Sequence, residues 1–313
     1  MAIKYEAGIN GFRQLSKMIF NFWGILKHRI ALFRVHQWIK NLFIFLPLFF
    51  GLKLTDLHLL ARCGISFISF CFISSAVYVF NDLFDLEMDR LHPKKKFRPI
   101  AAGTISNKEA VCEIIILLVL GIGLITVLKS VLAILIISGY LLINFLYTIK
   151  LKNIAILDVF LIAVGFIVRI FMGGVVCNIV LSHWIVIMTF LLALFLGFAK
   201  RRDDLLLFEK TGEKARSNIS DFTLNFINQA MTIMASVVIV AYTMYTLSPE
   251  VISRTNPNLY FTTVFVIWGV LRYLQLTLVH NKSGNPTKIV LVDRYLQFII
   301  LGWILLFATL IYF

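Results

Sequence analysis

Long apolar runs recur along this chain, and they are the feature that most restricts its fold. Crossing the ~30 Å hydrocarbon core of a bilayer takes about 20 residues of α-helix. Nine candidate runs fall at 39–55, 63–80, 110–128, 130–149, 154–176, 183–199, 228–249, 259–279 and 294–313. With 60% hydrophobic residues and a mean hydropathy of +0.89, the chain can bury its apolar surface only in lipid. We therefore predict an all-α, polytopic integral membrane protein with about nine transmembrane helices, plus or minus one because Pro47 and several serines interrupt the first two runs.

Basic residues are unevenly distributed over the connections between these runs. Most of the Lys and Arg residues fall in the N-terminal segment and on one side of the membrane, whereas the other side receives Lys53, Arg62, Lys129 and Arg254. Cytoplasmic connections carry the excess of basic residues, so we expect a cytoplasmic N-terminus and an external C-terminus. The net charge of +14 mostly reflects this asymmetry and favours anionic lipids and phosphorylated substrates, not nucleic acid, as partners.

The segment before the first run has its own pattern. Apolar residues recur at steps of three and four between Phe12 and Phe33, with basic residues between them. This pattern favours an amphipathic helix on the inner membrane face, and a mobile basic tail is the alternative. We assign 1–35 as a cytoplasmic amphipathic segment and expect no cleavable signal peptide.

A charged stretch at 81–103 separates the second and third apolar runs. Its sequence, NDLFDLEMDRLHPKKKFRPIAAG, places four acidic residues before five basic ones. If the preceding helix continues to residue 89, Asn81, Asp85 and Asp89 recur every four residues. Asp82 lies three residues before Asp85, so one face carries oxygen ligands of the kind that Mg²⁺ binds together with substrate phosphates. The following lysines and Arg98 can hold those phosphates; the alternative is a solvated loop whose acids form caps and ion pairs.

These residues also carry a family resemblance. NDLFDLEMD followed by KFRPIAAG resembles the NDxxDxxxD signature of the UbiA superfamily of intramembrane prenyltransferases. WIKN at 38–41 is similar to the family's WxKN element, and YTIKLKNIAILD at 147–158 matches its tyrosine, lysine and acidic positions at Tyr147, Lys152 and Asp158. The chain looks most like the branch that makes polyprenylphosphoryl-5-phosphoribose from 5-phosphoribosyl 1-pyrophosphate.

The resemblance implies a UbiA-like transmembrane catalytic domain over 36–313, in the bacterial inner membrane, with a cytoplasm-facing active site. It implies Mg²⁺-dependent transfer of 5-phosphoribose to a membrane polyprenyl phosphate, with release of pyrophosphate. Candidate metal ligands are Asn81, Asp82, Asp85 and Asp89. Candidate catalytic residues are Asp85, Asp89, Arg98 and Lys152. Candidate phosphate-binding residues are Lys40, Lys95, Arg98, Tyr147, Lys152, Arg169, Lys200 and Arg201.

Arg169 lies inside an apolar run, where a charge costs a few kcal/mol or more unless it is paired or faces water. It needs an anion, either Asp158 or another helix in a structural ion pair, or a substrate phosphate. Arg272 in the eighth run needs a partner that the sequence does not name. Gly165, Gly173 and Gly174 would allow close helix packing.

Two other functions remain open from the sequence. A prenyltransferase of the same fold would move a prenyl group from a prenyl diphosphate to an aromatic or other small acceptor. Its second DxxxD is absent here, because Asp203 and Asp204 have no acid four residues on, and Asp204 stands where the resemblance predicts a glutamate. A transporter would need polar residues along a path between both faces, whereas the charges gather on one side.

Four cysteines are scattered through apolar runs without metal-type spacing, and we assign them to packing. The oligomeric state, including a homo-oligomer, and the prenyl chain length stay open.

Overall fold

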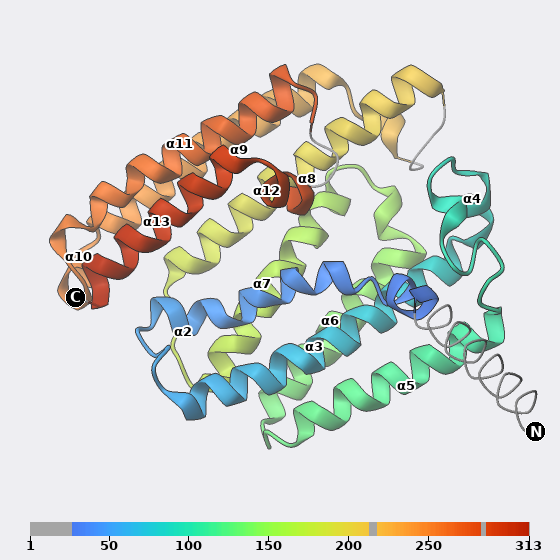
Figure 1. Cartoon of the computed structure of the whole chain (residues 1–313), viewed down its shortest axis with the longest axis horizontal. Helices are drawn as coiled ribbons and strands as arrows, with labels where there is room; N and C mark the ends of the chain where they lie inside the picture. The colour runs from blue at the N-terminus through green and yellow to red at the C-terminus, as the bar shows by residue number, and fades with distance from the viewer. Residues whose placement is uncertain (1–26, 213–217, 283–285, 313) are drawn as a thin grey trace, which may run out of the picture. The chain divides into compact units, whose positions relative to one another are not determined.

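The computed structural model describes residues 27–212, 218–282 and 286–312 (Figure 1). Most of the amphipathic segment expected at 1–35 lies outside them. Each regular element in the described ranges is a helix, which confirms the predicted all-α class.

The long helices follow the predicted apolar runs, except that the helix expected at 183–199 continues to residue 211. They are α3 (Leu57–Phe84), α5 (Asn107–Thr126), α6 (Val131–Ile149), α7 (Leu157–Cys177), α8 (His183–Thr211), α9 (Leu224–Leu247), α11 (Thr263–Leu274) and α13 (Arg294–Tyr312). The short elements are η1 (Val35–Phe45), α2 (Leu46–Phe50), α4 (Leu86–Leu91), η2 (Lys95–Phe97), η3 (Leu151–Asn153), η4 (Ile219–Asp221), α10 (Pro249–Arg254), η5 (Pro257–Thr262), η6 (Gln275–Val279) and α12 (Pro286–Val292).

Within the described residues, eight helices are long and apolar enough to cross a membrane, one of them formed by η5, α11 and η6 together. The ninth predicted span, at 39–55, is shorter, because a 3₁₀-helix gives way at residue 46 to the five-residue helix α2. Pro47 lies in the first turn of α2, where its missing N–H breaks no helical hydrogen bond. The count falls within the predicted range.

The chain divides into two compact units. The first comprises Met1–Asn41 and Ile68–Val127, and the second comprises Leu42–Phe67 and Leu128–Phe313. The core of the first unit is formed by Leu32, Ala76, Val79, Leu86, Ile100, Ile105, Ala110 and Leu117.

Serines in the second apolar run make polar contacts inside the first unit. Ser69 Oγ donates to the carbonyl of Gly121 at 2.7 Å, and Ser75 Oγ donates to that of Phe33 at 2.9 Å. Trp38 Nε1 donates in turn to Ser75 Oγ at 3.0 Å. These hydroxyls join segments through hydrogen bonds that hydrocarbon cannot supply, which explains why an otherwise apolar run contains them.

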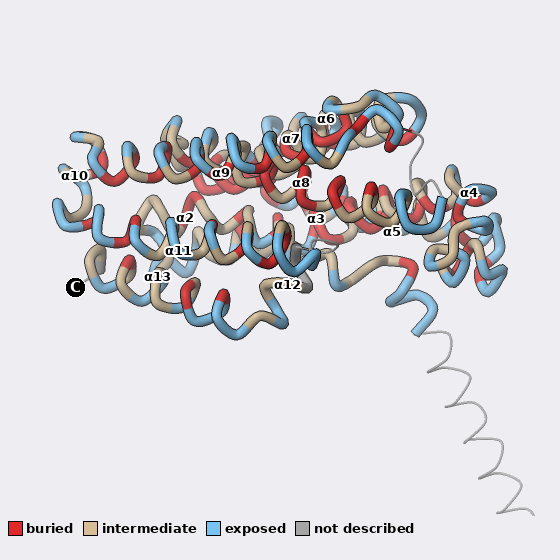
Figure 2. Tube along the Cα trace, turned by 90° about the horizontal axis from the view of Figure 1, so that it is seen from above, coloured by how far each residue is buried: buried red, intermediate tan, exposed pale blue. Residues whose placement is uncertain are grey.

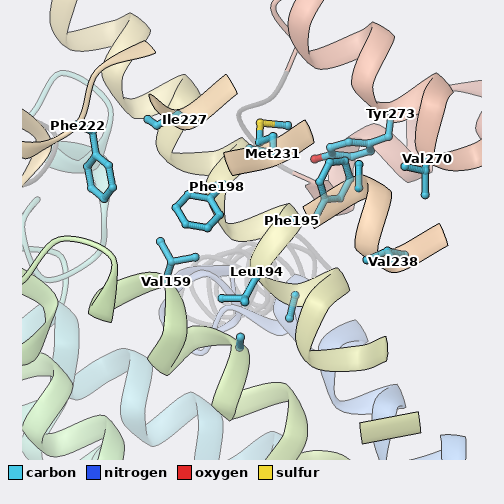
Figure 3. Close-up of a cluster of buried hydrophobic side chains, with 14 of the residues drawn as sticks. Val159, Leu194, Phe195, Phe198, Phe222, Ile227, Met231, Val238, Val270 and Tyr273 are labelled. Atoms are coloured by element: carbon cyan, nitrogen blue, oxygen red, sulfur yellow. The ribbon is translucent and has the colours of Figure 1, made fainter. Parts of the chain in front are cut away.

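In the second unit, consecutive helices pack side by side. α7 packs on α6 and α8, α8 packs on α9, and α11 packs on both α9 and α13. The largest core lies among α7, α8, α9 and α11, where Phe195, Phe198 and Met231 are buried with their neighbours (Figure 3). Figure 2 shows buried and exposed residues alternating along these helices. Their outer faces are apolar, with Leu135 60% and Phe298 67% exposed, as expected for surfaces that meet lipid.

Glycine allows one close approach that the sequence analysis anticipated. A Cβ at Gly173 would lie 2.0 Å from the carbonyl oxygen of Ile44. That oxygen belongs to the backbone and cannot rotate away, so α7 packs against the 42–50 segment only because residue 173 has no side chain.

Gly173→Ala should therefore destabilise the second unit. Overpacking of this kind costs about 1–3 kcal/mol, and we expect the melting temperature of the detergent-solubilised protein to fall by several degrees. Gly139→Ala is the matched control, because a Cβ at Gly139 on α6 meets nothing within 4 Å. Equal melting temperatures for the two variants would contradict this packing.

Candidate functional site

The predicted helical face at 81–89 forms with one distortion. α3 ends at Phe84 and α4 begins at Leu86, with Asp85 between them at φ −91° and ψ 11°. The i to i−4 hydrogen bonds nevertheless continue, since Asp85 N donates to Asn81 O at 2.9 Å and Asp89 N donates to Asp85 O at 2.8 Å. Asn81, Asp85 and Asp89 therefore lie one helical turn apart, as predicted.

Two carboxylates of this segment are buried and share one guanidinium group. Asp82 and Asp89 are each 2% exposed. Arg98 Nη1 donates to Asp82 Oδ1 at 2.9 Å and to Asp89 Oδ2 at 2.5 Å. Lys95 Nζ lies 4.0 Å from Asp89 Oδ1. The basic run thus folds back onto the acidic face through the turn of η2.

Arg34 is a second guanidinium partner of Asp82 that the sequence analysis did not select. Its Nη2 forms an ion pair with Asp82 Oδ1, and its guanidinium lies 5.2 Å from the ring centroid of Tyr78. Burial lowers the pKa of Arg34 from its ordinary value, while the Asp82 carboxylate acts in the opposite direction. Arg34 also has a φ of 49°, a left-handed conformation uncommon outside glycine. We call Arg34, Asp82, Asp89, Lys95 and Arg98 the first cluster.

The donor atoms of this segment fit Mg²⁺ in chemistry. Carboxylate and amide oxygens are the hard ligands that this ion prefers, and two carboxylates already converge on one cationic nitrogen. Among the described residues, no three Asp, Glu, His or Cys side chains are arranged to hold a metal ion. Arg98 Nη1 lies between Asp82 and Asp89 and pairs with both.

A second cluster lies where α7 and α8 pack together. Arg201 Nε donates to Asp158 Oδ2 at 2.6 Å, and both side chains are fully buried. Arg201 Nη1 also donates to Asp204 Oδ2 at 3.1 Å. Within the described part of the chain, Asp158 Oδ1 and Arg201 Nη2 are buried without a hydrogen-bond partner. Arg201, predicted to bind phosphate, is thus also a structural partner of Asp158.

The predicted phosphate-binding residues Tyr147, Lys152 and Lys200 belong to the second unit. Tyr147 lies in the last turn of α6, Lys152 in η3, and Lys200 beside Arg201 on α8. All three are half-buried. Asn218 Nδ2 donates to the backbone carbonyl of Lys152 at 3.1 Å, which fixes the connection between α6 and α7.

Arg169 is buried on α7 and contacts Tyr140. Its Nη1 donates to the Gly165 carbonyl at 2.6 Å and its Nη2 to Tyr140 Oη at 3.2 Å. The guanidinium lies 5.2 Å from the Tyr140 ring centroid. Gly165 leaves room for this, because a Cβ there would be 3.4 Å from Arg169 Nη1. Asp158, one of the partners expected for Arg169, makes an ion pair with Arg201.

Two further arginines find partners. Arg272 Nη2 donates to Asp293 Oδ2 at 2.8 Å, and this bond lowers the pKa of the Asp293 carboxyl. Arg202, which sequence reasoning passed over, donates through Nε to Asn228 Oδ1 at 2.9 Å and through Nη1 to the Thr277 carbonyl at 2.8 Å. Thr277 lies in η6, a π-helix, and such turns are frequent at functional sites.

The remaining sequence candidate, Lys40, belongs to the first unit. It lies half-buried in η1, beside Asn41, whose Nδ2 donates to Ser74 Oγ at 3.3 Å. The WxKN element is therefore anchored to α3.

The long apolar helices with charged clusters at and near their ends define a polytopic helical membrane protein. Comparison with known families makes this more specific: the chain belongs to the UbiA prenyltransferase family, which matches residues 42–299. Members of this family are transferases, so the protein is an enzyme of that class.

Relatives and solved structures agree with this assignment. The decaprenyl-phosphate phosphoribosyltransferase of Mycolicibacterium smegmatis is 32% identical over 293 residues, covering 90% of this chain and 91% of the relative. The enzyme of the same name from Corynebacterium glutamicum is 30% identical, covering 90% and 86%. A UbiA homologue from Archaeoglobus fulgidus, solved bound to DMAPP and Mg²⁺, has a TM-score of 0.65 at 17% identity, covering 90% of this chain and 99% of that one. The predicted resemblance and fold are confirmed.

The Arg201→Leu variant should have a lower melting temperature than a variant that loses a surface charge. Removing one partner of a buried ion pair leaves the other uncompensated, at a cost of about 3–5 kcal/mol. We expect a large fall in melting temperature in detergent, partly reversed by adding Asp158→Asn. Lys200→Leu, the neighbouring and only half-buried position, is the control. If Arg201→Leu is as stable as Lys200→Leu, Arg201 does not hold α7 and α8 together.

Proposed function

We propose that this enzyme transfers 5-phosphoribose from 5-phosphoribosyl 1-pyrophosphate to a polyprenyl phosphate in the bilayer and releases pyrophosphate. The observation that carries the proposal is the similarity, over nine-tenths of the chain, to decaprenyl-phosphate phosphoribosyltransferases. The reaction takes place at the cytoplasmic face of the bacterial inner membrane, where the basic connections and the phosphorylated donor lie.

Asn81, Asp82, Asp85 and Asp89 hold Mg²⁺ in this proposal. The buried, paired state of Asp82 and Asp89 supports it, because both carboxylates already share a cation. When bound, the ion would neutralise charge on the pyrophosphate and assist its departure.

Basic residues bind the phosphates of the two substrates. In the first unit these are Lys40, Lys95 and Arg98. Arg98 presents a planar fork suited to two phosphate oxygens, and it reaches them by exchanging its carboxylate partners for phosphate. In the second unit Lys152 and Lys200 contribute point charges, Arg169 and Arg201 contribute guanidinium groups, and Tyr147 contributes a hydroxyl donor.

The chemistry needs no strong general base, since the acceptor phosphate is already anionic. A phosphate oxygen of the lipid attacks ribose C1 as the bond from C1 to the pyrophosphate oxygen breaks, with inversion at C1. The chain's own residues contribute by positioning the two reactants and by placing positive charge where the leaving group accumulates negative charge.

Asp85→Asn and Asp89→Asn should abolish most turnover. Each change removes a charged oxygen proposed to hold the metal, and we expect a loss on the order of a hundredfold or more. The assay follows labelled 5-phosphoribosyl 1-pyrophosphate into lipid with purified protein, polyprenyl phosphate and Mg²⁺, and EDTA should have the same effect. Glu87→Gln is the matched control, because Glu87 is 84% exposed and pairs with Arg90.

Two results would contradict this reading. One is full activity of both asparagine variants. The other is a wild-type protein that puts no label into lipid at any chain length but consumes a prenyl diphosphate with an aromatic acceptor.

Lys152→Met should weaken binding of the phosphorylated substrate more than Lys150→Met. We expect the KM to rise by about tenfold, corresponding to ~1.4 kcal/mol, because Lys152 is half-buried in a fixed turn whereas Lys150 is exposed. Steady-state kinetics of both variants measure the difference. Equal KM values would remove Lys152 from the phosphate-binding residues.

A further inference from the structure

Two cysteine sulfurs meet inside the second unit. Cys63 lies in the second turn of α3, and Cys177 is the last residue of α7. Their Sγ atoms are 3.0 Å apart, although 114 positions separate them in sequence, and both thiols are free. Covalent bonding would bring the sulfurs to about 2.05 Å, so a shift of roughly 1 Å closes the bond.

The backbone around this pair is fixed on both sides. Arg62 Nε donates to the Val176 carbonyl at 2.6 Å. Arg62 directly precedes Cys63 in the sequence, and Val176 directly precedes Cys177. Cys177 Sγ contacts the Leu59 carbonyl at 3.6 Å, and Cys63 Sγ contacts that of Ile44 at 3.7 Å. The close approach of Gly173 to Ile44 holds α7 in place one turn earlier. The sulfurs therefore meet as a consequence of helix packing.

The orientation expected from the basic connections, with these on the cytoplasmic side, places the pair toward the outer face. α3 runs from Leu57 to the acidic segment at its other end, and α7 begins beside the basic connection at 150–152 and ends at Cys177. The ends with few basic residues face outward. The space outside a bacterial inner membrane is oxidising, and disulfides persist there.

We propose that Cys63 and Cys177, which are 0% and 4% exposed in the folded protein, form an intramolecular disulfide in the cell during folding, before the helices cover them, through exchange with a protein disulfide oxidant on the outer face. The thiolate of one cysteine attacks a sulfur of the oxidant's disulfide, and the second thiolate then displaces the oxidant's thiol. The pair loses two electrons and two protons, and the oxidant becomes a dithiol. The product links the start of α3 to the end of α7 and closes a long loop, which restricts the unfolded chain.

Cys71 and Cys112 serve as internal controls. Both belong to the first unit; Cys71 is buried and accepts a hydrogen bond from Asn41 Nδ2 at 3.3 Å, and Cys112 is exposed on α5. The proposal rests on the orientation of the helices and is independent of the transferred group.

Thiol trapping in cells tests the proposal. Cells producing the full chain are quenched with acid, free thiols are blocked with N-ethylmaleimide in denaturant, and disulfides are then reduced and labelled with a polyethylene-glycol maleimide. We expect two added labels for wild type, Cys71→Ser and Cys112→Ser, and none for Cys63→Ser or Cys177→Ser. Mass spectrometry of the unreduced wild-type protein should show residues 63 and 177 in one linked peptide pair, so the test does not depend on any variant folding.

A second readout follows from the loop closure. Reductant should lower the melting temperature of the wild-type protein by several degrees, without effect on the Cys63→Ser, Cys177→Ser double variant. Wild-type protein without labels, labels that persist in Cys63→Ser, or a linked peptide containing Cys71 or Cys112 would each overturn the proposal.

Discussion

A charged side chain among apolar helices must find an opposite charge or a dense set of hydrogen bonds, because lipid offers neither. Each of the buried charges described above meets this requirement inside its own unit. Asp82 and Asp89 share Arg98, and Asp158 is paired with Arg201. Breaking such a pair costs more than its net contribution to stability, since the remaining charge cannot escape to water. These contacts therefore fix how the helices that carry them pack.

The same requirement for paired charges also bears on the proposed chemistry. In the first unit, acid and base neutralise one another across the turn between α4 and η2. In the proposed function, Mg²⁺ and the substrate phosphates would exchange partners with these charges. In the second unit, Arg201 donates hydrogen bonds to both Asp158 and Asp204. The backbone carbonyl of Lys152 accepts a hydrogen bond from Asn218. In the proposed function, stability and substrate binding draw on the same residues, and separating the two requires both melting and kinetic data.

Periodicity and hydropathy predict the local part of this structure. The apolar runs predict most spans to within about six residues, but the helix expected at 183–199 continues to residue 211 and the run at 39–55 forms only short helices. The four-residue spacing predicts the acidic face at 81–89. The ion-pair partners could not be predicted in this way, because they are far apart in the sequence. Arg34 and Asp82 are 48 residues apart, and Arg201 and Asp158 are 43 residues apart. A sequence pattern reports which face of a helix a residue occupies, but not which distant helix meets that face. For this reason Arg34, the pairing of Arg272 with Asp293 and the contact between Cys63 and Cys177 are visible only in the structure.

The most direct test of the proposed function asks which bond breaks. Polyprenyl phosphate labelled with oxygen-18 in its phosphate is incubated with the purified enzyme, 5-phosphoribosyl 1-pyrophosphate and Mg²⁺, and the products are analysed by mass spectrometry. Attack of the lipid phosphate on ribose C1 predicts that all of the label stays in a phosphoribosylated lipid and that the released pyrophosphate is unlabelled. Label in water-soluble phosphate, with the prenyl chain joined to another acceptor, would contradict the account.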